Sequence, residues 1–140
     1  MKTGIIFLFS NDEKEIKENK FETLLIKDSS KFCFVNNASN DRTLERLKEI
    51  KETTLKNVSI VDIKKNKGVN AAIKAGVRYL KNNEDFSSII YFEFSKYSGY
   101  HNLEKILTRI INKKEILNFI SDTSKRNILK NVFSLEQIIK

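Results

Sequence analysis

Polar residues follow directly on an apolar run in the segment SSIIYFEFSK, residues 87–96. The run ends at the carboxylate of Glu93, and Phe94, the hydroxyl of Ser95 and the ammonium of Lys96 come next. Carboxylate and hydroxyl oxygens can bind hard cations such as Mg²⁺ and Mn²⁺, and a lysine can bind a phosphate directly. This spacing suits a site for a phosphorylated ligand, with or without a divalent cation.

Three more polar clusters each follow an apolar run: Ser10-Asn11-Asp12, Asn36-Asn37 and Lys64–Gly68. The third cluster opens an amphipathic segment at Asn66 and Gly68. The free backbone N–H groups of a helix start favour an anion there. The glycine could instead serve a close approach between chain segments. The lysines of this cluster could contact a diphosphate or remain in solvent.

Short apolar runs bounded by polar residues predict buried strands. The predicted strands are Gly4–Phe9, Lys31–Asn36, Val58–Ile63, Ser87–Phe94 and Glu115–Ile120. Apolar residues at spacings of three and four predict the helices between them. These helices cover about Glu13–Ile26, the segment from Asp41 to Asn57, the segment from Asn66 to Leu80, about Leu103–Ile111, and a tail from about Ser124 to Lys140.

Alternating strands and helices predict an α/β fold with a mostly parallel sheet and helices on both faces. Ligands of such sheets bind outside the carboxyl ends of the strands. The four polar clusters lie at these ends, so we expect them to meet at one edge of the sheet. Asp41 precedes the second helix, where it could cap the helix or order the loop.

The composition indicates one globular domain over residues 1–140. Hydrophobic residues make up 40% and charged residues 31% of the chain, as is typical of folded proteins. No apolar run approaches the roughly 20 residues of a membrane-spanning helix. The single cysteine, Cys33, lies in an apolar run and has no intramolecular disulfide partner. We therefore expect a cytoplasmic protein with no transmembrane segment.

The chain carries a net charge of +8, which favours anionic partners. Its lysines are scattered rather than clustered, so compositional bias is the simpler explanation. Phe92 and Phe94 share one face of a predicted strand that helices cover, which disfavours nucleic acid as a partner. His101, the only histidine, follows Tyr97 and Tyr100 in a predicted loop. It lacks the second histidine or nearby cysteine that a zinc site needs.

The motifs, taken in order, resemble those of family 2 glycosyltransferases over residues 4 to about 110. The first is FSNDE with Asn11 and Asp12, and the second is VNNASNDRT, residues 35–43, in place of a Val-Asp-Asn-Gly-Ser type loop. The third is NKGVNAAIKAG with Asn66, Gly68, Ala72 and Gly76, and the fourth is Glu93-Phe94-Ser95 in place of Asp-x-Asp. Residues 111–140 form a divergent tail with a predicted helix.

This resemblance implies a Rossmann-like nucleotide-diphospho-sugar transferase half-domain. It implies transfer of a sugar from a nucleoside diphosphate donor to an acceptor that the sequence does not identify. Donor-binding residues would be Asn11, Asp12, Asn36, Asn66 and Gly68. Glu93 and Ser95 would bind the diphosphate, directly or through Mg²⁺ or Mn²⁺ as cofactor.

The sequence departs from the family pattern at three places. Asn36 replaces the aspartate that contacts the nucleotide, and Ser95 replaces the second aspartate of the metal motif. Lys96 would repel a cation if it pointed inward. Family members also continue into an acceptor segment with a catalytic base, whereas about 45 residues follow Ser95 here. Asp122 is the weak candidate for that base, and it could instead cap the tail helix.

These departures leave an alternative open. The chain could be a catalytically inactive or truncated relative that acts as a nucleotide-binding or protein-interaction module. Such a module would use a protein partner or a second copy of the chain to complete its surface. An exposed apolar surface where an acceptor segment should lie would favour this interpretation.

Overall fold

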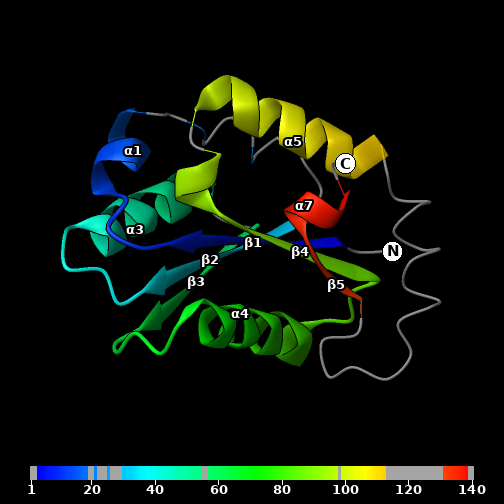
Figure 1. The fold of residues 1–140 in the computed structure, drawn as a ribbon, viewed down its shortest axis with the longest axis horizontal. Coiled ribbons are helices and arrows are strands. Elements are labelled where there is room, and N and C mark those ends of the chain that lie inside the picture. Colours follow the sequence, from blue (N-terminus) through cyan, green and yellow to red (C-terminus); the bar gives the residue numbers. More distant parts are fainter. Residues whose placement is uncertain are drawn as a thin grey trace.

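The computed structural model describes residues 3–18, 21, 25, 30–54, 57–97, 99–112 and 131–138. Their strands form one parallel sheet in the order β3-β2-β1-β4-β5 (Figure 1). The strands are β1 (Thr3–Phe9), β2 (Lys31–Asn37), β3 (Val58–Ile63), β4 (Ser88–Glu93) and β5 (Val132–Ser134). The order reverses between β1 and β4, which makes this boundary the expected ligand position.

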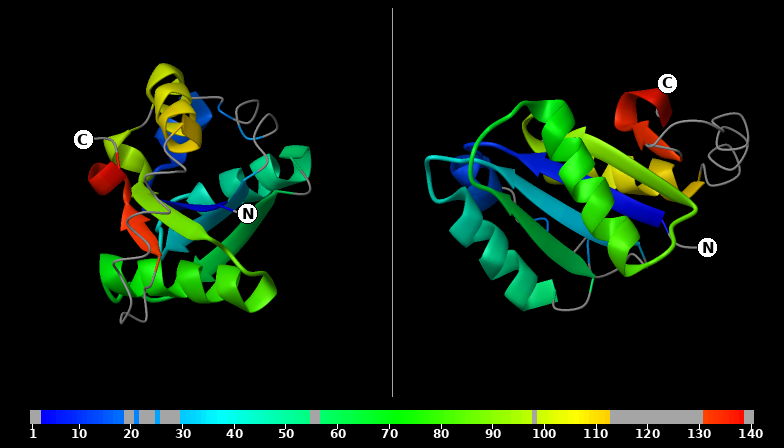
Figure 2. Two further views of the ribbon diagram at one scale, coloured as in Figure 1. Left: turned by 90° about the vertical axis from the view of Figure 1, so that its right-hand side faces the viewer. Right: turned by 90° about the horizontal axis from the view of Figure 1, so that it is seen from below.

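Helices cover both faces of the sheet. Helix α4 lies on one face, and α1, α3 and α5 lie on the other (Figures 1 and 2). The described helices are α1 (Glu13–Glu18), α3 (Thr43–Thr54), α4 (Val69–Asn83), the 3-10 turn η1 (Phe94–Lys96), α5 (Tyr100–Asn112) and α7 (Leu135–Ile138). The predicted α/β fold with a parallel sheet and helices on both faces is confirmed.

The central strand β1 is buried along its whole length. Alternation sends Phe7 and Phe9 to one face and Ile6 and Leu8 to the other. The ring of Phe7 packs against neighbouring aromatic rings at centroid distances from 4.6 to 6.1 Å, a range in which tilted and edge-on ring pairs are favourable. The first face is therefore an aromatic core, and the second is an aliphatic core under α4.

A glycine lets α4 approach the aliphatic face closely. A Cβ atom at Gly76 would lie 3.0 Å from Cδ1 of Ile6 and 3.0 Å from Cγ2 of Val35. Helix–sheet contact at this distance leaves no room for a side chain. The glycine at position 76 is therefore required by packing.

Most predicted elements agree with the structure within a few residues at their ends, but some details differ. The strand predicted to end at Phe94 ends at Glu93, because Phe94 begins the turn η1. His101 does not lie in a loop, since α5 begins at Tyr100. The predicted tail helix is wrong at Val132–Ser134, which pair with β4 as strand β5. Val69 is an apolar residue of the helix predicted from Asn66 to Leu80, yet it is 44% exposed.

Several predictions fall outside the described residues. They are the strand over Glu115–Ile120, the candidate base Asp122, the first part of the predicted tail helix (residues 124–130), and most of the helix predicted to continue from α1 to Ile26. Phe21 and Leu25, which are described, are both buried in the aromatic core. Within the described part of the chain, no helix has the length and apolar character needed to cross a membrane.

Adding a side chain at Gly76 should destabilise the protein. Gly76→Val would insert a branched side chain against Ile6 and Val35, and overpacking of this kind costs about 1–3 kcal/mol. The free energy of unfolding in urea measures the effect. Lys74→Val introduces the same side chain at an exposed position of α4 and should change stability by less than about 1 kcal/mol. Equal stabilities of the two variants would contradict the packing argument.

Candidate functional site

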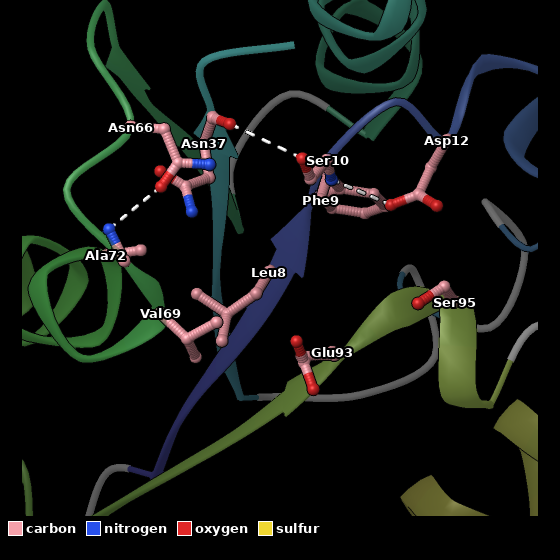
Figure 3. Close-up of a pocket in the computed structure, with 11 residues that line it drawn as sticks. Leu8, Phe9, Ser10, Asp12, Asn37, Asn66, Val69, Ala72, Glu93 and Ser95 are labelled. Atoms are coloured by element: carbon pink, nitrogen blue, oxygen red, sulfur yellow. Dashed lines mark hydrogen bonds between the residues drawn. The ribbon is translucent and has the colours of Figure 1, made fainter.

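A cavity of about 230 Å³ lies at the carboxyl ends of β1 and β4, where the strand order reverses (Figure 3). Its position is the one in which open parallel sheets bind ligands. The loop that begins α4 closes one side of it. The cavity is lined by Leu8, Phe9, Ser10, Asp12, Asn37, Asn66, Gly68, Val69, Ala72, Glu93 and Ser95.

The lining divides into two chemically different halves. Figure 3 shows Asn37, Asn66 and Val69 on one side of β1 and Glu93 and Ser95 on the other. The first half offers side-chain amides between apolar groups. The second half offers a carboxylate and a hydroxyl. A ligand that fills the cavity therefore meets side-chain amides at one end and a carboxylate with a hydroxyl at the other.

Asp12 lines the cavity with its carboxyl group largely buried. Burial raises the pKa of this carboxyl to about 6, although the Ser10 N–H donates to its Oδ2 at 2.9 Å and opposes the shift. Nearby Glu93 adds a smaller repulsion in the same direction as burial. The Asp12 N–H donates to Oγ1 of Thr43 at 2.9 Å, which fixes the residue between two loops.

Glu93 ends β4 opposite Leu8 of β1. Its carboxylate forms an ion pair with Lys96, with Nζ 2.8 Å from Oε2. The hydrogen bond to Glu93 and the charge of that carboxylate raise the pKa of the Lys96 ammonium. Lys96 therefore binds Glu93 itself, and its charge partly neutralises the carboxylate that would attract a cation.

Asn66 and Gly68 shape the start of α4. The Gly68 N–H donates to Oδ1 of Asn66 at 2.8 Å. Gly68 has φ 99°, and a Cβ atom added to it would meet nothing within 4 Å, so the backbone conformation, rather than a close approach, requires glycine. Among the described residues, no side chain caps the helix start. The free N–H groups of its first turn are therefore available at the cavity wall.

Asn11 and Asn36 do not line the cavity. Instead they join the loops that follow β1 and β2. The Asn40 N–H donates to Oδ1 of Asn11 at 2.7 Å, and the Asn11 N–H donates to Oγ of Ser39 at 3.0 Å. The Ser39 hydroxyl in turn donates to Oδ1 of Asn36. The structure thus brings together five predicted site residues, Asp12, Asn66, Gly68, Glu93 and Ser95, and leaves Asn11 and Asn36 outside the cavity.

Asp41 has the role of a capping residue. Its Oδ1 accepts from the Thr43 N–H at 3.0 Å, at the start of α3. Its Oδ2 accepts from the Glu13 N–H at 3.2 Å, at the start of α1. One carboxylate therefore satisfies backbone donors of two helices. The capping interpretation is confirmed, and the same residue also orders the loop.

The sequence of this chain matches a known protein family. The model of the family described as Glycosyl transferase family 2 matches residues 11–92, more than half of the 140-residue chain. The chain belongs to this family. No curated protein matches it.

Solved structures of TarS from S. aureus share the fold. The structure of TarS 1–349 has 21% identity and a TM-score of 0.52, over 80% of this chain and 33% of that one. The structure of TarS 1–349 in complex with UDP-GlcNAc has 20% identity and a TM-score of 0.50, over 80% of this chain and 32% of that one. At this identity the likeness concerns the fold alone. The chain spans about a third of the length of these matched chains.

A contact with the neighbouring strand explains why an asparagine suits position 36. Asn36 lies directly beside Asp62 in the register of β2 and β3. Its Nδ2 donates to Oδ1 of Asp62 at 2.9 Å. The aspartate usual in the family would place two carboxylates in contact at this point. Asp62 thus makes an amide the compatible residue, because only the amide supplies a donor.

A divalent cation does not fit the described residues well. Within them, no group of three or more His, Cys, Asp or Glu side chains is placed to hold a metal ion. Glu93 is already paired with Lys96, and Ser95 contributes a hydroxyl in place of the second carboxylate of the family motif. A cation at this strand end would have to displace Lys96, so we assign no catalytic step to a metal.

Asn37 lines the cavity, although the sequence interpretation selected its neighbour Asn36. Both residues end β2, and alternation along the strand separates them. Asn36 follows Phe32 and Phe34 on the aromatic face, whereas Asn37 follows Cys33 and Val35 on the face of α4. The alternation is visible in the sequence, but the side of the sheet that holds the cavity is not.

Restoring the family aspartate at position 36 should destabilise the protein. Asn36→Asp would place a carboxylate against Asp62, and the loss of the amide donor together with the repulsion should cost about 1–3 kcal/mol at pH 7. Asp62→Asn in the same chain should recover most of this loss, because it restores a donor between the two side chains. Urea unfolding of the two single variants and the double variant measures the coupling. Additive effects would contradict the pairing.

Asp12 should make stability depend on pH. Its pKa is raised from 3.8 to about 6, so the folded protein holds this proton more tightly than the unfolded chain. Stability should therefore fall as the pH rises from about 4 to 6. Asp12→Asn keeps an acceptor for the Ser10 N–H and removes the titration. Its stability relative to the parent should rise by about 1–3 kcal/mol between pH 4 and pH 7.

Urea midpoints of the parent and of Asp12→Asn at several pH values test this prediction. The difference between the two proteins isolates Asp12, because the other carboxyl groups titrate in both. A difference that stays constant from pH 4 to pH 7 would show that the Asp12 carboxyl titrates normally.

Proposed function

We propose that this chain is the nucleotide-diphospho-sugar-binding part of a glycosyltransferase. It would bind a nucleoside diphosphate sugar in the cavity and present the sugar for transfer to an acceptor hydroxyl. The observation that supports this most is the position of the cavity, at the point where the strand order of a family 2 fold reverses.

The start of α4 is the best candidate for contact with the diphosphate. This helix is 15 residues long, and its dipole places partial positive charge at the N-terminus. Gly68 and Val69 bring that terminus to the cavity, with no described side chain capping it. Backbone N–H groups at a helix start bind phosphate oxygens without a counter-ion. This arrangement would compensate for the weak cation ligands at Glu93 and Ser95.

The other predicted donor-binding residues would then act in two ways. Asp12 and Asn66 would contact the donor directly, because both line the cavity. Asn11 and Asn36 would act indirectly, by holding the loops that carry those contacts. Asp122 stays a prediction for the catalytic base, since it lies outside the described residues. The alternative of an inactive interaction module has no support from the fold or the comparisons.

Calorimetric titration with UDP, GDP and UDP-GlcNAc tests the proposal. One structural neighbour is a complex with UDP-GlcNAc, which makes the uridine compounds the first probes. We expect binding of at least one nucleotide, and titrations with Mn²⁺ and with a chelator would show whether a cation contributes. No binding of any of these compounds at millimolar concentration would contradict the proposal.

A variant at the helix start gives a sharper test. Val69 is 44% exposed, so Val69→Glu should leave stability unchanged or slightly higher, because a negative charge suits the first turn of a helix. The same charge would repel a bound diphosphate, and nucleotide affinity should fall about tenfold or more. Val69→Gln is the neutral control of similar size. Equal affinities of the Glu and Gln variants would rule out phosphate contact at this terminus.

A further inference from the structure

The solvent-facing side of α4 carries positive charge and no negative charge. Lys74, Arg78 and Lys81 follow one another at spacings of four and three residues, so they lie on one side of the helix. All three residues are exposed, and so is Lys67, which lies just ahead of the helix start. Helix α4 contains no Asp or Glu. We call Lys67, Lys74, Arg78 and Lys81 the basic ridge.

The fold leaves the basic ridge open to a partner. Ile73 and Val77 place the opposite side of α4 in the aliphatic core. Helix α4 is the only described helix on its face of the sheet, while α1, α3 and α5 share the other face (Figures 1 and 2). Within the described part of the chain, Lys74 and Arg78 form no ion pair. A broad surface can therefore reach the ridge without meeting another described helix.

The two other long helices that the structure describes have a different charge pattern. Helix α3 carries three acidic and three basic residues, and α5 carries one acidic and two basic residues. The first acidic residues after α4 are Glu84 and Asp85, and Glu84 forms an ion pair with Lys31 at 3.9 Å. Ahead of α4, Asp62 pairs with Lys64. Positive charge is therefore concentrated on α4 more than on α3 or α5.

The shape of the ridge favours a membrane surface as the anionic partner. Lys74 and Lys81 are about 10 Å apart along the helix axis, so their potentials add within about one Debye length at ordinary salt. Clusters of about four to eight Lys and Arg residues beside a membrane bind acidic lipid head groups. Single-stranded nucleic acid instead binds in a charged groove with several stacking aromatic residues. Helix α4 has one aromatic residue, Tyr79, and its exposed side is convex.

We propose that the basic ridge holds the protein on the surface of a membrane that contains anionic phospholipid. The apolar side of α4 belongs to the core, so the contact is electrostatic and the helix does not insert. Lys67 lies between Asn66 and Gly68, which line the cavity, so binding brings the rim of the cavity close to the membrane. This inference goes beyond the proposed function, because it requires no nucleotide.

Flotation of the protein with lipid vesicles tests the inference. At low salt we expect the protein to bind vesicles of phosphatidylcholine mixed with phosphatidylglycerol, and not vesicles of phosphatidylcholine alone. NaCl at about 1 M shortens the Debye length to about 3 Å and should release the bound protein. Failure to bind the anionic vesicles at low salt would overturn the inference without any variant.

A triple variant of the ridge locates the contact. Lys74→Gln, Arg78→Gln and Lys81→Gln together remove three cations, each of which contributes about fivefold to binding of an anionic surface. The affinity for phosphatidylglycerol vesicles should fall about twentyfold or more. Glutamine suits an exposed helix position as well as lysine or arginine does, so the urea midpoint should stay the same.

A matched control removes the same charge from the opposite face of the sheet. Lys51→Gln, Lys105→Gln and Arg109→Gln take two lysines and one arginine from exposed positions of α3 and α5. The affinity of this control for anionic vesicles should change by less than about threefold, because these positions lie more than a Debye length from a membrane that contacts α4. Equal losses in the two triple variants would overturn the inference, because net charge alone would then account for binding.

Two further measurements separate this inference from its neighbours. Duplex DNA that binds the parent more tightly than anionic vesicles do, and that the ridge variant no longer binds, would overturn the membrane assignment in favour of nucleic acid. The substituted cations do not line the cavity, so the ridge variant should bind nucleotide as the parent does. Loss of vesicle binding with nucleotide binding kept supports the role of the ridge, and a parent that binds vesicles and no nucleotide overturns the proposed function alone.

Discussion

The hydrogen bonds between the loops after β1 and β2 hold the functional edge of this protein in place. Strand β1 is buried throughout, and the chain leaves the core at Ser10. The backbone polar groups of the next few residues therefore need hydrogen-bond partners outside the sheet. Asp41, Thr43 and Ser39 supply most of them. The two strands are paired with each other as far as Phe9 and Asn36, and these contacts extend that order into the loops beyond the strand ends.

Because of these loop contacts, some residues of the family motif have a structural role in this chain. Motif residues can occupy the expected positions and yet serve the loop framework rather than the ligand. Asn11 and Asn36 both do so, because their side-chain groups are occupied by neighbouring loops and strands. The asparagine at position 36 suits Asp62 on the adjacent strand, because its amide donates a hydrogen bond to that carboxylate. Loss of a motif residue here reflects local electrostatics, and by itself it says little about loss of activity.

The sequence predicted the fold well and the site only in part, for physical reasons. Buried strands and helices of two or more turns have strong hydrophobic periodicity, and they appeared where expected. Strand β5 was missed because three residues carry no periodic signal, and their pairing depends on β4, which is distant in sequence. Asn37 was passed over because its face of the sheet borders a cavity only once α4 is packed on that side. Such information comes from tertiary packing, which a local pattern does not contain.

The positive net charge of the chain also indicates less about ligand binding once the positions of the lysines are known. A net charge of +8 suggests an anion-binding surface, yet two ion pairs involve lysines near the functional edge. Lys96 binds Glu93 and Lys64 binds Asp62. Exposed lysines elsewhere are screened within about 10 Å at ordinary salt, so they affect the approach of a nucleotide more than its bound geometry. Under the proposed function, recognition would then depend on groups that carry no net charge, such as the helix start at Gly68 and the amide of Asn66.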